Sequence, residues 1–300
     1  MPGPEAAPAG VVSRCAWAKV NLYLHITGRR PDGYHELDSL VVFAGIGDRL
    51  TFAPAPALSL ELLGAFAAEV PEGADNLVLR AAQTLAQGLD LTPGAAIHLE
   101  KSLPVAAGLG GGSADAAVCL QALSTLWNRR LAPGEEMDMA VHLGADVPVC
   151  LYGRPAFMGG AGERLLRAPP LPAAWLVLVN PAVPLNTAEV FRAHDGKVSQ
   201  PARWTEVAPD APALAELLAA RRNDLEPPAR ALVPAIDRVL DSLEAEPDCL
   251  LARLSGSGAT CFGLFAARDE AVHAAGRIRE RFPAWWVAAA PMLHGPMDQL

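Results

Sequence analysis

Residues 104–117 are the segment of this sequence whose composition points most directly to chemistry. They read PVAAGLGGGSADAA, with four glycines among residues 108–112 and an alanine-rich, helix-forming stretch directly afterwards. Glycine lets backbone N–H groups approach a ligand closely, and the first turn of a helix adds N–H donors and the positive end of its dipole. We therefore predict that this loop binds phosphate groups, most simply those of a nucleotide.

The neighbouring residues exclude three common glycine-rich loops. A Walker A loop places Lys and then Ser or Thr after its last glycine, whereas Ser113 follows Gly112 directly. A dinucleotide fingerprint has a glycine at the position of Ser113, and protein kinases carry His-Arg-Asp and Asp-Phe-Gly motifs that this sequence lacks. A flexible linker is the remaining alternative, but strand-like residues 95–100 precede the loop and a helical pattern follows it at once.

Three other short segments carry polar residues that could take part in chemistry. Lys19 lies in an alternating strand, Asp146 lies between glycine and proline in GADVP, and residues 254–260 form the Gly/Ser turn LSGSGAT. Each also has an ordinary structural explanation as a solvated strand lysine, a turn aspartate and a hairpin loop. The residues alone leave both interpretations open.

Composition predicts a globular protein with a large core. The chain has 300 residues, of which 51% are hydrophobic and 19% charged, and its formal net charge is −9, which argues against a general nucleic-acid binder. No apolar run approaches the roughly 20 residues that span a bilayer, and the first ten residues look like a tail without signal-peptide features. Five cysteines without a Cys-x-x-Cys pair indicate reduced thiols in a cytoplasmic protein and argue against a cysteine metal site.

Hydrophobic periodicity predicts alternating strands and helices of the α+β class. In residues 16–26 the even positions are apolar and form a core face, so Lys19 and Asn21 share the opposite face, from which both can reach a cleft. Residues 165–172 contain Pro169-Pro170 and predict a rigid connector between domains 1–166 and 167–300. The other expected strands are 37–43, 49–53, 95–101, 174–180, 250–254, 260–265 and 285–290, and the expected helices are 76–87, 113–127, 133–144, 187–194, 211–220, 234–243 and 269–281.

Taken together, these segments resemble the GHMP kinase superfamily over nearly the whole chain. The resemblance is carried by AKVNL (18–22), GRRPDGYHEL (28–37), NLV (76–78), residues 104–117, GADVP (144–148), NDLE (223–226) and SGSGAT (255–260). It implies a two-domain α+β fold with an N-terminal ATP-binding domain like ribosomal protein S5 domain 2 and a ferredoxin-like C-terminal domain. Ala107 and Ala114 stand where the family often has Gly and Ser, for which we expect slightly altered loop flexibility and no loss of activity.

The resemblance also implies an ATP-dependent kinase with Mg²⁺. DGYH beside AKVNLYL is similar to the branch that phosphorylates the 2-hydroxyl of 4-diphosphocytidyl-2-C-methyl-D-erythritol, on the non-mevalonate route to isoprenoids. Asp146 would accept the hydroxyl proton, while Lys19 would keep that carboxylate ionised and steady the transferred phosphate. The ATP-binding residues would be Pro104, Val105, Ala106, Ala107, Gly108, Leu109, Gly110, Gly111, Gly112, Ser113 and Ala114, with Ser113 as a candidate Mg²⁺ ligand.

Substrate recognition is implied for a second set of residues. Tyr34 and His35 would hold the cytosine by stacking and hydrogen bonds, and Asn21, Gly256 and Ser257 would also contact the substrate. The expected partner is this small molecule, with no nucleic acid and no membrane, and the protein would be a monomer or homodimer. The alternatives are another GHMP-type alcohol kinase, of the mevalonate or homoserine type, and a catalytically dead nucleotide sensor or scaffold, which would be expected to lack Lys19 or Asp146.

Overall fold

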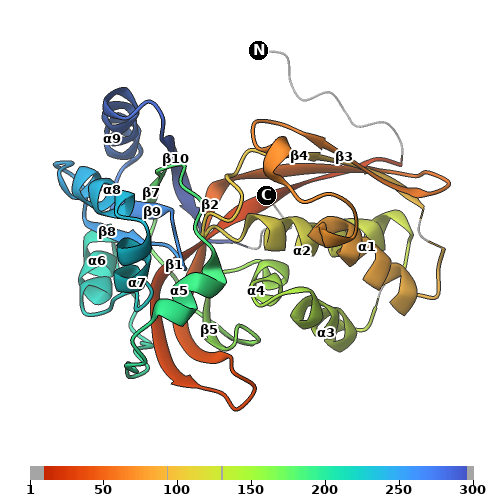
Figure 1. Cartoon of the computed structure of the whole chain (residues 1–300), viewed down its shortest axis with the longest axis horizontal. Helices are drawn as coiled ribbons and strands as arrows, with labels where there is room; N and C mark the ends of the chain where they lie inside the picture. The colour runs from red at the N-terminus through yellow and green to blue at the C-terminus, as the bar shows by residue number, and fades with distance from the viewer. Residues whose placement is uncertain (1–9, 93, 130, 296–300) are drawn as a thin grey trace. The chain divides into compact units, whose positions relative to one another are not determined.

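The computed structural model describes residues 10–92, 94–129 and 131–295, which form a mixed α/β structure (Figure 1). Its contacts divide the chain into two compact units. The first unit contains the described residues among Met1–Ala16, Gly47–Val105 and Gly111–Leu151, and the second contains those among Trp17–Ile46, Ala106–Gly110 and Tyr152–Leu300. The units interleave along the chain, and the predicted domains 1–166 and 167–300 stay a prediction.

In the first unit, helices pack against a small sheet. Strand β4 (Ala95–Glu100) pairs antiparallel with the end of β2 (His35–Ala53) and parallel with β3 (Leu58–Leu63). The helices are α1 (Leu77–Gly88), α2 (Gly111–Leu126), α3 (Pro133–Leu143) and α4 (Val147–Tyr152), and two short 3-10 turns span Ala67–Glu69 and Gly73–Asp75. As predicted, α1 is capped by Asn76, whose side chain accepts hydrogen bonds from two backbone N–H groups of its first turn.

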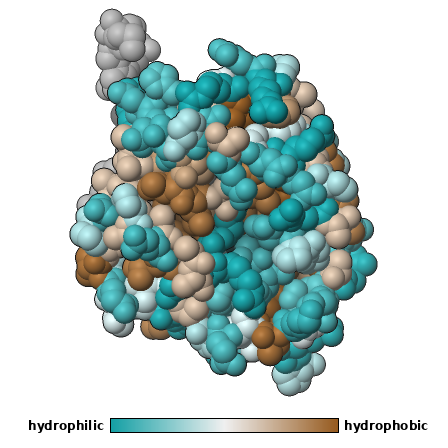
Figure 2. All heavy atoms as spheres, turned by 90° about the vertical axis from the view of Figure 1, so that its left-hand side faces the viewer, coloured by the Kyte–Doolittle hydropathy of each residue, from teal (hydrophilic) through white to brown (hydrophobic). Residues whose placement is uncertain are grey.

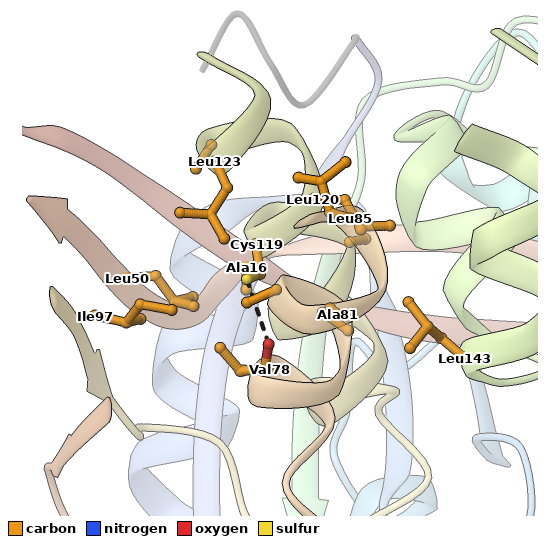
Figure 3. Close-up of a cluster of buried hydrophobic side chains, with 14 of the residues drawn as sticks. Ala16, Leu50, Val78, Ala81, Leu85, Ile97, Cys119, Leu120, Leu123 and Leu143 are labelled. Atoms are coloured by element: carbon orange, nitrogen blue, oxygen red, sulfur yellow. Dashed lines mark hydrogen bonds between the residues drawn. The ribbon is translucent and has the colours of Figure 1, made fainter. Parts of the chain in front are cut away.

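The core of the first unit anchors α2, the helix that follows the glycine loop. Alternate residues of β4 are buried, as expected for a strand with one face on the core. Leucine and alanine side chains from α1, α2 and α3 belong to one buried cluster with these strand residues, and the thiol of Cys119 in α2 donates to the carbonyl of Val78 in α1 (Figure 3). The labelled members of this cluster are Ala16, Leu50, Val78, Ala81, Leu85, Ile97, Cys119, Leu120, Leu123 and Leu143.

The sheet of the second unit is built mainly from antiparallel strand pairs. β7 (Trp175–Asn180) pairs with both β10 (Trp286–Leu293) and β9 (Cys261–Phe265), and β9 forms a hairpin with β8 (Leu251–Leu254). β10 also pairs with β2, whose first half pairs with β5 (Ala156–Gly160), and β5 pairs with β6 (Arg164–Arg167). β1 (Val12–Arg29) pairs with β2, and its first residues belong to the other unit.

Five helices lie in the described part of the second unit, which ends at residue 295. Helix α8 (Ala235–Glu244) packs on β8 and β9, while α9 (Arg268–Arg281) packs on β7, β9 and β10 (Figure 1). The others are α5 (Thr187–Ala193), α6 (Ala211–Ala219) and α7 (Glu226–Leu232). Figure 2 shows hydrophobic side chains among a mostly hydrophilic surface, and the large exposed hydrophobic residues include Val207, Leu232 and Val272.

The structure corrects several expectations from the sequence. Residues 165–167, predicted as part of a connector, form most of β6 because they pair with β5. Helices α4 and α7 and strand β5 were not predicted, and α2 begins at Gly111, two residues before the expected start. Lys19 and Asn21 were expected to share a face of β1 that reaches a cleft, with a solvated Lys19 as the alternative, and the structure buries both residues almost fully. No helix in the described ranges combines the length and the apolar character needed to cross a membrane.

Candidate functional site

The residues predicted for the site are divided between the two units. Lys19, Asn21, Tyr34, His35, residues 106–110, Gly256 and Ser257 belong to the second unit, whereas Pro104, Val105, residues 111–114 and Asp146 belong to the first. The geometry is therefore given for each unit separately. The pairing of Lys19 with Asp146 in one reaction stays a prediction.

The part of the glycine loop in the second unit has its carbonyl groups bound by its neighbours. The carbonyl oxygens of residues 107, 108 and 109 accept hydrogen bonds from the Thr260 N–H (3.1 Å), the Ser255 hydroxyl (3.0 Å) and the Lys19 N–H (2.8 Å), respectively. Ala106, Gly108 and Gly110 have positive φ angles of 51°, 75° and 60°. Left-handed residues that alternate with right-handed ones gather N–H groups into an anion-binding concavity, and the alternate positive φ values of this loop match that pattern.

Gly108 lies directly against the turn between β8 and β9. A Cβ atom at this position would lie 2.4 Å from the Ser255 carbonyl oxygen and 2.8 Å from the Gly258 carbonyl oxygen. No side chain fits in that space, and the positive φ also favours glycine. The Gly/Ser turn, for which the residues alone left a plain hairpin loop as one interpretation, therefore supports the glycine loop.

The turn itself is held by residues from other segments of the second unit. The side-chain amide of Asn223 donates to the carbonyls of Leu254 (2.9 Å) and Gly256 (2.7 Å). The hydroxyl of Ser257 is hydrogen-bonded to that of Thr187, at the start of α5, at 2.8 Å. Asn223 begins the NDLE motif, so the structure gives this motif a role in fixing the turn.

Lys19 is buried and oriented by a chain of hydrogen bonds. Its Nζ donates to Asn21 Oδ1 at 2.9 Å, and Asn21 Nδ2 donates to the hydroxyl of Ser39 at 2.8 Å. That hydroxyl donates to the Tyr23 carbonyl at 2.6 Å, while the Asn21 N–H donates to the Ser255 hydroxyl at 3.2 Å. A buried ammonium is costly unless hydrogen-bonded, and this network explains how β1 carries one.

Asn21 and Gly256, both predicted to contact the substrate, lie next to each other. A Cβ atom on Gly256 would lie 3.2 Å from Asn21 Oδ1, and Gly256 has a φ of 57°. The structure thus brings together Lys19, Asn21 and the Gly/Ser turn. Their contacts with a substrate stay a prediction.

An aromatic cluster surrounds His35 in the second unit. The ring of Phe191 in α5 stacks on His35 with centroids 5.1 Å apart, and His194 meets it edge-on at 6.2 Å. Burial first, and then the neighbouring Arg29 and His194, lower the pKa of His35 below its ordinary value, so its ring is neutral near pH 7. Tyr34 is 61% exposed and follows Gly33, whose φ is 93°.

Sequence analysis missed Phe191. The helix 187–194 was predicted, but nothing in the local pattern indicated that this aromatic residue would lie against His35, 156 positions before it in the chain. A neutral histidine can both donate and accept a hydrogen bond, and aromatic rings can stack on a planar base. The cluster therefore has the chemistry of a nucleobase site.

In the first unit, the loop continues into α2. Gly112 and the half-buried Ser113 lie in its first turn, and a Cβ atom on Gly112 would meet nothing within 4 Å. Because the first turn of a helix leaves N–H groups without helical partners, open space beside Gly112 lets an anion reach them. At Gly111 a Cβ atom would instead lie 3.1 Å from the Nζ of Lys101.

Asp146 lies between α3 and α4. It is half-buried, and its carbonyl accepts a hydrogen bond from the Cys150 N–H at 3.2 Å. The preceding Gly144 ends α3 with a φ of 167°, which is extended backbone. Asp146 thus lies in a turn, as the sequence predicted, and its backbone carbonyl is held by the start of α4, a helix that was not predicted.

The described residues contain no cluster of three or more His, Cys, Asp or Glu side chains arranged to hold a metal ion. Mg²⁺ in phosphate-transfer sites usually keeps several waters and binds through substrate phosphates with only one or two protein oxygens. The half-buried hydroxyl of Ser113, in the first turn of α2, is an oxygen donor of this kind. The residues present therefore fit Mg²⁺ that arrives with a nucleotide.

Comparison with known proteins agrees with these features. Residues 76–154 match the GHMP kinases N terminal domain, and residues 206–284 match GHMP kinases C terminal. The chain is 56% identical over 278 residues to 4-diphosphocytidyl-2-C-methyl-D-erythritol kinase of Paramagnetospirillum magneticum, a match that covers 92% of this chain and 96% of that protein. The chain belongs to the GHMP kinase family. The resemblance inferred from the sequence motifs is confirmed.

Two further similarities refine its place in the family. The enzyme of the same name from Rhodospirillum rubrum is 52% identical, covering 94% of this chain and 92% of that protein. A crystal structure of 4-(cytidine 5'-diphospho)-2C-methyl-D-erythritol kinase is 36% identical with a TM-score of 0.75, covering 95% of this chain and all of that one. Among GHMP kinases, the chain therefore falls with these enzymes, and ATP as phosphate donor follows from the family.

Proposed function

We propose that this protein transfers the γ-phosphate of ATP to the 2-hydroxyl of 4-diphosphocytidyl-2-C-methyl-D-erythritol, giving the 2-phosphate and ADP. The observation that carries this proposal is the 56% identity, over nearly the full length of both chains, with a relative named for this kinase activity. The proposed place of the reaction is the non-mevalonate route to isoprenoid precursors, in the cytoplasm.

ATP would bind through the glycine loop. Residues 105–114, which follow Pro104, supply backbone N–H groups from the loop and from the first turn of α2. The carbonyls of residues 107–109 are already bound within the protein, which leaves fewer electronegative groups to oppose the phosphates. Fixed N–H donors stabilise phosphoryl transfer because little reorganisation is needed when charge develops.

Asp146 is proposed as the base that accepts the proton of the attacking hydroxyl, and Lys19 as the cation that stabilises the transferred phosphoryl group. The hydrogen bond from Lys19 to Asn21 supports this role, since it limits the positions open to the ammonium. Mg²⁺ would be held mainly by the ATP phosphates, with the Ser113 hydroxyl as protein ligand, and would neutralise phosphate charge.

The cytosine would be held by Tyr34, His35 and, in addition, Phe191. Stacking on an aromatic ring and hydrogen bonds from a neutral imidazole suit a neutral base. Asn21, Gly256 and Ser257 would contact the rest of the substrate. This assignment is supported by the position of Gly256 next to Asn21.

The test is an ADP-release assay with purified protein, ATP, Mg²⁺ and the proposed substrate. The parent protein should turn over, and Asp146→Asn should lower kcat by about 100-fold or more, the usual contribution of a general base. Asp138→Asn, an exposed aspartate in α3, is the matched control and should leave kcat unchanged. Full turnover in Asp146→Asn would remove this residue from the mechanism.

A substrate panel separates the alternatives. Only the proposed reaction requires a cytidine group, so turnover of mevalonate or homoserine instead would assign another GHMP-type alcohol kinase. ATP binding without transfer to any member of the panel would favour a nucleotide sensor or scaffold.

A further inference from the structure

Three charged side chains form a buried cluster at the base of the glycine loop, within the first unit. Lys101 follows β4, Asp48 lies in β2 and Asp115 lies in α2, and each is at most 3% exposed. Lys101 Nζ donates to Asp48 Oδ2 and, at 2.8 Å, to Asp115 Oδ2. Sequence analysis assigned no role to any of the three.

Asp48 holds the residues that lead into the loop. Its Oδ1 accepts hydrogen bonds from the backbone N–H groups of Ser102 (2.6 Å) and Leu103 (2.9 Å), directly before Pro104. Hydrogen bonds from N–H groups to a carboxylate are among the stronger ones in proteins. The direction in which the chain enters the loop therefore depends on this side chain.

The same cluster contacts the residues where the loop ends. A Cβ atom on Gly111 would lie 3.1 Å from Lys101 Nζ and 3.5 Å from Asp48 Oδ2, so the ammonium lies directly against the first residue of α2. Asp115, one helical turn later, is bonded to the same ammonium. Both ends of the segment 102–111 thus contact the same cluster of three side chains, through hydrogen bonds at residues 102 and 103 and through close packing at Gly111.

We propose that Lys101, Asp48 and Asp115 are positioning residues for ATP, which hold the first turn of α2 at the angle at which its N–H groups meet the phosphates. The inference rests on the proposed function, because it takes the glycine loop as the phosphate site. Pre-organised donors bind more tightly because the binding energy is not spent on ordering them. The cluster acts on the nucleotide through the loop and does not touch it.

The two carboxylates of the cluster are not equivalent. Asp48 has partners on both oxygens, whereas Asp115 bonds Lys101 through Oδ2 and its buried Oδ1 has no hydrogen-bond partner among the described residues. Asparagine at position 115 can keep the bond to Lys101 through its carbonyl oxygen. Alanine at this position removes the bond and frees the ammonium beside Gly111.

The experiment is calorimetric titration of the purified full chain with ADP and Mg²⁺, together with kinetics. We expect Asp115→Ala to weaken ADP binding and raise the KM for ATP by about tenfold, the size expected for a lost hydrogen bond to a charged group. The KM for the alcohol substrate should stay within twofold of the parent value. Asp115→Asn should restore ADP binding to within about twofold.

Leu123→Ala is the matched control for a purely structural effect. Leu123 is a fully buried core residue two turns further along α2, so its truncation lowers the melting temperature without touching the loop. Its ADP affinity should equal that of the parent. If Asp115→Ala binds ADP like the parent, or if Leu123→Ala or Asp115→Asn loses as much affinity as Asp115→Ala, the positioning role is wrong. A parent protein that binds no nucleotide would instead refute the proposed function itself.

Discussion

Gly108 and Gly112 are only four residues apart in the sequence. Replacing each of them by alanine should nevertheless change the stability of the protein in opposite directions. At Gly108 the added Cβ would lie 2.4 Å from the Ser255 carbonyl oxygen, and φ is 75°. At Gly112 the added Cβ would meet nothing within 4 Å. The two substitutions add the same methyl group at positions four residues apart, one in the loop and one in the first turn of α2, so they form a matched pair.

The expected magnitudes follow from these environments. A non-glycine residue in the left-handed region costs about 1–2 kcal/mol, and relief of the overlap with Ser255 requires a backbone shift that adds to this cost. We expect Gly108→Ala to destabilise the fold by about 2–3 kcal/mol. Gly112→Ala should stabilise it by up to about 1 kcal/mol, because alanine favours a helix over glycine.

The effect of Gly112→Ala on nucleotide binding should be opposite to its effect on stability. The open space beside Gly112 is where phosphates are proposed to approach the helix, so Gly112→Ala should raise the KM for ATP at least tenfold despite its greater stability. Urea unfolding measures the stabilities, and calorimetry with ADP measures the affinities. If Gly112→Ala binds ADP as tightly as the parent, the phosphates do not approach this turn. If Gly108→Ala unfolds at the same urea concentration as the parent, the packing argument for Gly108 is wrong.

Three further predictions test other parts of the structure. Burial, opposed by Lys101 and reinforced by Asp48, raises the pKa of Asp115 from 3.8 to about 7, so stability should fall as the pH rises from about 4 to 7. Asp115→Asn should remove that decline, which urea unfolding at pH 5 and pH 8 measures. If the free energies of unfolding of the parent and the variant differ by the same amount at both pH values, the prediction is wrong. Phe191→Ala should raise the KM for the alcohol substrate several-fold and leave that for ATP unchanged; equal changes in both would argue against a nucleobase site. Leu120→Ala, in the core of the first unit, should cost about 2–5 kcal/mol of unfolding free energy by calorimetry, and a loss under 1 kcal/mol would mean that the site collapses around the cavity.

Much of the secondary structure could be predicted because its signals are local. The Asn76 cap and the apolar stripe of α1 lie within a few residues of each other, and α1 begins at Leu77, the residue after the cap. Strand β6 was missed because its residues pair with β5 and carry little pattern of their own. The burial of Lys19 was also missed, since a period of two shows that it faces away from the apolar side but not what covers it.

The sequence by itself determined the family and the candidate chemistry, because the glycine loop, DGYH and the positions of Lys19 and Asp146 are short motifs in which residue type and spacing carry the meaning. Only the tertiary structure decided how the loop is held. Thr260 and Ser255 bind its carbonyls from about 150 residues away in the chain, and Asp48 reaches its entry from another strand. Such contacts depend on which distant segments pack together, and packing is a property of the folded chain that no local pattern encodes.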